Sequence, residues 1–219
     1  MSDELMLTRA TVKIRAMIGT GEFAPGTRLS ERALAASLEL GRASIREALR
    51  VLEQEKLVQI VARRGTFVVQ PTANDLAQIY EIRSAVESAA ASLAARRGAS
   101  DTLTRQAHQM EEMLQEGAGG SLAAQRLGWS FHDEIFAITE NSLLAELYQK
   151  LRMRGGKEIP QHIEGDVMRG TQEHIAIFHT IKNKDVEKAR VLMFDHVKNA
   201  SELRIRLLSE RRSINEIEK

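Results

Sequence analysis

Three of the six histidines in the chain lie at positions where the sequence predicts an inward-facing side chain. Each has apolar neighbours three and four residues away, and such neighbours share its face of a helix. These neighbours are Ile135 and Phe136 for His132, Ile177 and Phe178 for His174, and Leu192 and Met193 for His196. Three helices that each point one imidazole into a bundle core can build a metal site from three nitrogen ligands.

The other three histidines are predicted to lie at the surface. His108 has the polar neighbours Glu111 and Glu112, and His179 has Lys182 and Asn183. His162 lies in a predicted connection between helices. A single histidine on a helix is more often a core or surface residue than a metal ligand. The metal hypothesis therefore depends on three histidines sharing one core.

A row of arginines within LGRASIREALRVLEQEKLV (40–58) is the second group that could do chemistry. On a helix turning by about 100° per residue, it forms a basic stripe spanning roughly 80° beside an apolar, core-facing stripe. The basic stripe is Arg42, Arg46 and Arg50, and the apolar stripe is Ile45, Ala48, Leu49 and Leu52. Since Glu47 and Glu53 lie nearby, a solvated face with charge pairs is the alternative to a face that binds nucleic acid.

The elements around this helix favour nucleic-acid binding. A helix is predicted over 7–20, Pro25-Gly26 is a turn, and Ser30 can cap a second helix. After the arginine helix, LVQIVARRGTFVVQP (57–71) is typical of a β-hairpin with a basic tip at residues 62–65. Helix, helix-turn-helix and hairpin together make a winged helix, whose basic wing would lie along the duplex that receives the arginine helix.

Pro71 marks the predicted boundary between two domains. Residues 1–71 form the winged helix-turn-helix domain, and residues 72–219 form an all-α helical bundle. The bundle helices are predicted over 75–97, 101–116, 121–139, 142–154, 167–182 and 185–210. The fold class is therefore mainly α, with one small β-hairpin wing.

The composition excludes several classes of protein. With no cysteine in 219 residues, the chain has no disulfides, zinc thiolates or cysteine nucleophile. No apolar run approaches the ~20 residues of a membrane span, and MSDELMLTRA lacks a signal-peptide core. We therefore expect a cytoplasmic protein with no membrane partner. Residues 1–72 hold 11 Lys/Arg against 8 Asp/Glu, which leaves the first third mildly basic.

The run APGTRLSERALAASLELGRASIREALRVLEQEKLV (24–58) resembles the GntR family of bacterial transcription regulators, and the resemblance spans most of 5–70. It implies a double-stranded DNA operator as partner, because guanidinium groups read guanine edges or clamp phosphates. The family's DNA contacts carry over to Arg32, Arg42, Ala43, Ser44, Arg46, Arg64 and Gly65. The chain departs from the family at Gly41, at Ala43-Ser44 and at Lys56, where Gly is usual; Ser44 is expected to cap the helix and Lys56 to strain its turn.

The later part of the chain resembles the FCD effector domain of the FadR subfamily, in its VanR-like branch. The matching pieces are YEIRSAVESAAASLAA (80–95), FHDEIFAITEN (131–141) and EHIAIFHTIKNKDVEKARVLMFDHV (173–197). The resemblance implies that His132, His174 and His196 bind a divalent metal and the effector. The family's Asp ligand is replaced by Gly128.

This replacement leaves three alternatives. A metal is held by the three histidines plus water and an effector carboxylate, or it is bound weakly, or the histidines contact the effector without a metal. For three imidazoles, Zn²⁺ or Ni²⁺ is favoured over Mn²⁺.

The resemblance makes Arg83 a clamp for a small carboxylate effector, whereas its position also allows a structural ion pair with Glu87 at i+4. We expect a homodimeric regulator that binds a palindromic operator and responds to a small organic acid. Two alternatives are a metal-dependent enzyme with a three-histidine site, and a DNA-binding module whose bundle only dimerises. The enzyme alternative has no HExxH, nucleophile elbow or phosphate loop in the sequence to support it.

Overall fold

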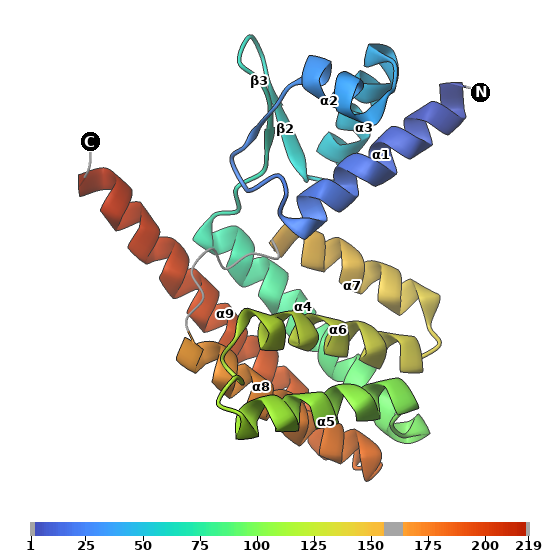
Figure 1. Cartoon of the computed structure of the whole chain (residues 1–219), viewed down its shortest axis with the longest axis vertical. Helices are drawn as coiled ribbons and strands as arrows, with labels where there is room; N and C mark the ends of the chain where they lie inside the picture. Colours follow the sequence, from blue (N-terminus) through green and yellow to red (C-terminus); the bar gives the residue numbers. More distant parts are fainter. Residues whose placement is uncertain (1–2, 156–163, 218–219) are drawn as a thin grey trace. The chain divides into compact units, whose positions relative to one another are not determined.

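The computed structural model of this chain describes residues 3–155 and 164–217 (Figure 1). Contacts among these residues divide the chain into two compact units, which we describe separately. The first unit holds the residues up to Thr72 and residues 152–155, and the second holds residues 73–151 and 164–217. Within the described ranges, no helix combines the length and the apolar character that crossing a membrane requires.

The first unit contains the predicted helix-turn-helix. Its elements are α1 (Asp3–Thr20), β1 (Arg28–Leu29), α2 (Glu31–Leu38), α3 (Arg42–Gln54), β2 (Val58–Val61) and β3 (Gly65–Val68). Ser30 begins α2 as predicted, because its hydroxyl accepts a hydrogen bond from the Ala33 N–H (3.3 Å). Gly41 precedes α3 without a side-chain cap, so the expected cap by Ser44 is wrong: Ser44 already lies inside the first turn.

The three strands form an antiparallel sheet in the order β1-β3-β2. β2 and β3 are the arms of the predicted hairpin, with Val61 opposite Gly65 (Figure 1). The pairing of β1, which sets Arg28 opposite Phe67, was not predicted. Lys56 precedes the hairpin with a φ of 61°, so the strained turn expected there is present.

The second unit is the predicted all-α bundle. Its helices in the described ranges are α4 (Ala73–Arg97), α5 (Asp101–Gln115), α6 (Leu122–Ile138), α7 (Ser142–Gly155), α8 (Glu164–Lys182) and α9 (Val186–Ile217). Their bounds lie within three residues of the predicted ones, except that α9 continues past residue 210. The mainly α fold class is therefore confirmed.

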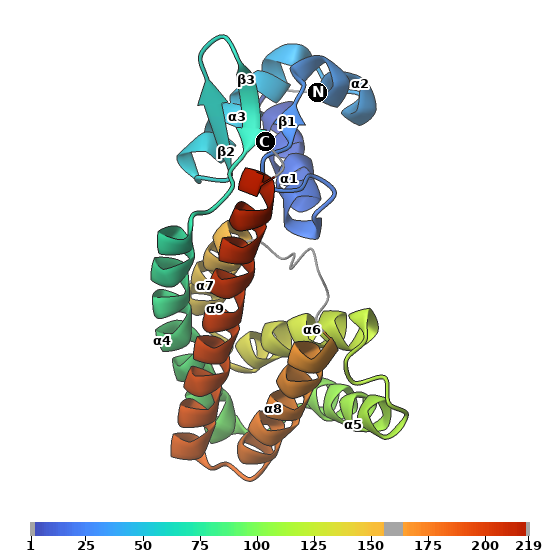
Figure 2. The ribbon, with the colours of Figure 1, turned by 90° about the vertical axis from the view of Figure 1, so that its left-hand side faces the viewer.

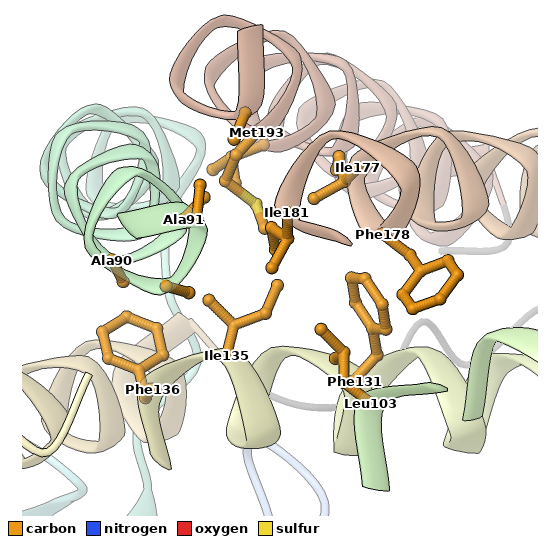
Figure 3. Packing of buried hydrophobic residues seen from close by; sticks show 14 of the residues in the cluster. Ala90, Ala91, Leu103, Phe131, Ile135, Phe136, Ile177, Phe178, Ile181 and Met193 are labelled. Atoms are coloured by element: carbon orange, nitrogen blue, oxygen red, sulfur yellow. The ribbon is translucent and has the colours of Figure 1, made fainter. Parts of the chain in front are cut away.

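Small side chains let the bundle helices approach one another closely. α4 and α9 run side by side in opposite directions (Figure 2), and α4 presents four buried alanines. These are Ala90, Ala91, Ala94 and Ala95. Figure 3 shows larger side chains of α5, α6, α8 and α9 pointing into the same interior, among them Phe131, Ile135, Ile177 and Met193. This tightly packed core fixes the helix faces that carry the histidines.

Candidate metal centre and nucleic-acid interface

The three inward histidines meet in the second unit. The Nε2 atom of His132 lies 3.1 Å from that of His174 and 3.2 Å from that of His196, and the third distance is 3.1 Å. All three residues are buried. Each histidine offers one nitrogen atom as a possible metal ligand, and these atoms all lie within 4.8 Å of one another. The predicted convergence of α6, α8 and α9 is therefore what the fold produces.

This triangle of nitrogens suits a single metal ion. Zinc binds imidazole nitrogen at about 2.0–2.1 Å, so two such ligands in a tetrahedral site lie about 3.3 Å apart. The observed separations of 3.1–3.2 Å are close to this value. Three nitrogen lone pairs at this distance repel one another unless a cation or a proton lies between them. The donor set thus fits Zn²⁺ or Ni²⁺, the ions favoured by imidazole ligands.

Glu87 on α4 orients His132 from behind. Its Oε2 lies 2.7 Å from Nδ1 of His132, a contact of ion-pair length that misses the geometry of a full hydrogen bond. Its Oε1 accepts a hydrogen bond of 2.7 Å from Nε of Arg83. A carboxylate at Nδ1 favours the tautomer whose Nε2 lone pair faces the triangle. The ion pair between Arg83 and Glu87, one of the two interpretations of Arg83, is therefore present.

Two neighbouring side chains keep the carboxyl group of Glu87 ionised inside the core. Burial opposes its charged form, but Arg83 and His132 outweigh burial and lower the pKa of Glu87 to about 2. Burial also lowers the pKa of His132, and burial together with the neighbouring imidazoles holds the pKa of His174 well below its usual range. The two histidines are therefore neutral at pH 7, which is the form that binds a metal.

His196 has a carboxylate partner of its own, Glu173, which the sequence pattern did not predict. Nδ1 of His196 lies 2.6 Å from Oε2 of Glu173 on α8, and Oε1 of Glu173 accepts a hydrogen bond of 2.9 Å from Nδ2 of Asn199. Burial raises the pKa of Glu173, but the hydrogen bonds with His196 and Asn199 and the charges of His196 and Arg169 together outweigh burial, and the net shift is downward. Glu173 directly precedes His174, yet only the packing of α8 on α9 brings it to His196.

A cavity of about 130 Å³ opens beside the histidines. Arg83 and Arg204 line it, although each is at most 7% exposed, and so does Tyr80. The Tyr80 hydroxyl accepts a hydrogen bond of 3.1 Å from Nη1 of Arg204, and the Arg83 guanidinium lies 4.6 Å from the centre of the Tyr80 ring. The cavity is about large enough for a molecule the size of benzene. A metal and two guanidinium groups around it would attract a small anion.

Arg204 and Tyr80 were not predicted as site residues, although the sequence holds a signal for Arg204. It continues an inward-facing stripe of α9 at helical spacing, in which Met193 and Val197 are buried and Ala200 is partly buried. A charged residue at the end of an apolar stripe marks a place where burial needs a polar partner. Of the histidines predicted at the surface, His108 and His179 are exposed, and His162 lies outside the described residues.

The candidate DNA-binding residues lie in the first unit and are mostly exposed. Arg42, Ala43 and Arg46 are exposed on α3 and Arg32 is exposed on α2, whereas Ser44 is only partly exposed. The opposite face of α3 buries Ile45, Ala48, Leu49 and Leu52, as the apolar stripe predicted. Charge pairs also form, since Arg46 contacts Glu31 (3.1 Å) and Arg50 contacts Glu47 (2.9 Å).

The wing tip brings together basic residues from the turn between β2 and β3 and from β1. Arg63 and Arg64 are exposed between β2 and β3, and Gly65 follows with a φ of 111°, which glycine adopts without strain. The guanidinium of Arg28, on β1, lies against Gly65: a Cβ at residue 65 would stand 3.1 Å from its Nε. Arg28 was not among the predicted site residues, because its place depends on the unpredicted pairing of β1.

Comparisons with known proteins match both units of the chain to known families. Residues 78–199 match the FCD domain family, and residues 8–68 match the family described as bacterial regulatory proteins, gntR family. The chain is 30% identical over 191 residues to the HTH-type transcriptional regulator YdhC of Bacillus subtilis (strain 168), covering 84% of each protein. It is 28% identical over 210 residues to LutR of the same organism, covering 85% of this chain and 95% of LutR.

A solved structure supports the fold. E. coli McbR/YncC superposes with a TM-score of 0.76 at 19% identity, covering 94% of this chain and 98% of that one. The names of the two sequence relatives describe transcription regulators and not enzymes.

Proposed function

Because this chain belongs to the GntR family of bacterial regulatory proteins and carries an FCD domain, we propose that it is a ligand-responsive transcription regulator that binds a palindromic operator as a homodimer. Residues 1–71 are the DNA-binding domain and residues 72–219 the effector-binding and dimerisation domain. The observation that carries the proposal is that one chain combines an exposed arginine face on a winged helix with a buried histidine cavity.

In this proposal, α3 enters the major groove of the operator and the wing follows the neighbouring backbone. Arg42 and Arg46 read base edges or clamp phosphates, and Arg32 contacts phosphate. Ala43 and Ser44 add small contacts in the groove, whereas Arg64 and Gly65 contact the backbone at the wing tip. Two copies of the chain read one half-site each.

The effector in this proposal is a small organic acid in the cavity of the second unit. His132, His174 and His196 would hold the metal, which would supply a Lewis acid for a carboxylate of the effector. Nε of Arg83 does not bind the effector, because it already donates a hydrogen bond to Glu87. The dimer has two conformations that differ in where its DNA-binding domains lie. The acid binds one of them more tightly and so shifts the dimer toward that conformation.

The proposed binding of α3 to DNA is tested with the variant Arg46→Ala. A duplex selected from a random pool by the wild-type protein serves as the operator. Loss of one bidentate base contact weakens binding by about 1–3 kcal/mol, or roughly 5- to 150-fold. The control is Arg97→Ala, which removes an exposed arginine from the second unit. Equal operator affinity for wild type and Arg46→Ala would contradict the placement of α3 in the groove.

The metal arm is tested by mass spectrometry of metal in the untagged protein, beside a His174→Ala variant. We expect about one Zn²⁺ or Ni²⁺ per chain in the wild type and a large loss in the variant. His179→Ala, which removes an exposed histidine of the same helix, should keep the metal. No metal in the wild type, even after soaking with both ions, would exclude the metal and leave the histidines to contact the acid directly.

A further inference from the structure

The ring of His174 lies in the space that a side chain at position 128 would need. Gly128 lies on α6, one turn before His132, and its Cα faces the His174 ring of α8. A Cβ built on Gly128 would lie 2.7 Å from Cε1 and 3.2 Å from Nδ1 of His174. Carbon atoms in contact lie about 3.5–4.0 Å apart. Even an alanine at 128 would therefore require the ring to move.

Aromatic rings surround the His174 ring where it does not face the cavity, and they limit how far it can move away from Gly128. The rings of Phe131 and His196 lie 4.9 Å and 4.4 Å from it, centre to centre, and the His132 ring lies 5.0 Å away. Phe131 is itself fully buried in the bundle core. Nδ1 of His174 has no hydrogen-bond partner among the described residues, so only packing and the contacts of Nε2 with His132 and His196 hold the ring. This contrasts with His132 and His196, which have Glu87 and Glu173.

We propose that Gly128 is the positioning residue of the histidine cluster: the space left by its missing side chain is what admits the His174 ring and brings its Nε2 into the triangle. The space at Gly128 is then not an open ligand position, because an added Cβ would meet the His174 ring. The imidazole of His174 fills that space. An incoming acid would enter through the cavity that Gly128 lines together with Arg83, Tyr80 and Arg204.

A double-mutant cycle on the metal-free full chain tests this coupling. Gly128→Ala is made in the wild type and in His174→Ala, and the melting temperature Tm of each protein is measured. The matched control is Gly170→Ala, because Gly170 lies on α8, lines the same cavity and has no atom within 4 Å of an added Cβ. Replacing glycine by alanine inside a helix raises stability by itself, so Gly170→Ala should raise Tm by roughly 2–4 °C.

The proposal predicts opposite signs in the two backgrounds. Gly128→Ala should lower Tm of the wild type by roughly 3–10 °C, because overpacking a core outweighs the gain in helix propensity. In His174→Ala, where the ring is absent, the same substitution should raise Tm as Gly170→Ala does. If Gly128→Ala alone does not fold, recovery of folding in the double variant gives the same answer. A similar change of Tm in both backgrounds would overturn the proposal.

Metal titration gives a second readout, which rests on the proposed metal site, whereas the Tm cycle does not. With Zn²⁺ and Ni²⁺, we expect Gly128→Ala to lose at least about tenfold in affinity and Gly170→Ala to stay near wild type. Unchanged affinity in Gly128→Ala would overturn the role of Gly128 in placing Nε2. If the wild type binds neither ion, the metal site fails, and the Tm cycle still decides whether Gly128 positions His174.

Discussion

Glu31 of α2 holds the guanidinium of Arg46, at the centre of the exposed face of α3. Nη2 and Nε of Arg46 donate hydrogen bonds of 3.1 and 3.3 Å to the same oxygen of Glu31. The Arg46 side chain is 53% exposed, so water screens this pair and it adds little to stability. Its effect is on position and charge, because it places a carboxylate beside the arginine proposed to contact DNA.

Glu31→Gln should therefore strengthen binding to DNA of any sequence. The substitution removes a negative charge from a surface proposed to approach phosphates, and it releases Arg46 from its partner. We expect affinity for a random duplex to rise roughly 2- to 10-fold at low salt, with a smaller gain on the selected operator. The measurement is fluorescence anisotropy on both duplexes. Glu47→Gln, which breaks the Arg50 pair instead, is the control. Weaker binding to both duplexes would mean that Glu31 chiefly orients Arg46.

Arg64→Ala should act through the phosphate backbone. Loss of one phosphate contact weakens binding similarly for all sequences and lowers the slope of log affinity against log salt by about 1. Titrations at several salt concentrations, on the selected operator and on a random duplex, measure this slope. A loss confined to the operator, with the slope unchanged, would instead indicate that Arg64 reads a base.

Glu87→Gln should cost more stability than Glu173→Gln. Glu87 is fully buried and pairs with buried Arg83, so its loss leaves an unpaired charge in the core and costs about 3–5 kcal/mol. The Glu173 side chain is 24% exposed, and its Arg169 contact is long at 3.9 Å. Both variants lose an orienting partner of a histidine, so both should lose roughly 10- to 100-fold in metal affinity. Urea unfolding and metal titration of the two variants check the difference, and equal losses of stability would refute it.

The metal-free protein should lose stability as the pH falls from about 7 to 5.5. Burial lowers the pKa of His132 and of His174, so both stay neutral in the folded chain. The unfolded chain takes up a proton on each histidine below about pH 6.5, so the unfolded state binds more protons in this window. Each such histidine then lowers the free energy of unfolding by up to about 1.4 kcal/mol per pH unit.

Urea unfolding at pH 7.5 and 5.5 measures this loss, and His174→Gln should reduce it. Glu87, with its pKa lowered to about 2, affects stability at lower pH. Its contribution to the free energy of unfolding is fully present above about pH 4.3 and is lost as the pH falls toward 2. An identical pH dependence in wild type and His174→Gln would contradict the burial of a neutral His174.

Local patterns in the sequence were sufficient to predict the helices, the β-hairpin and the identities of the central histidines. Helix periodicity placed His132, His174 and His196 on inward faces, and turn and cap residues such as Ser30 and Pro25-Gly26 bounded the elements. These signals are local, since each depends on residues within about one helical turn. The same local pattern separated the apolar and basic faces of α3.

Only the tertiary structure decided which residues support the histidines. Glu173 reaches His196, Arg204 reaches Tyr80, and Arg28 reaches Gly65 through the packing of separate elements. The loss of a ligand at Gly128 could be read from the sequence, but the use of its space by His174 could not. That relationship depends on where α6 and α8 lie relative to each other, to within a fraction of an ångström. The packing of the whole core sets this position, and no local pattern of residues does.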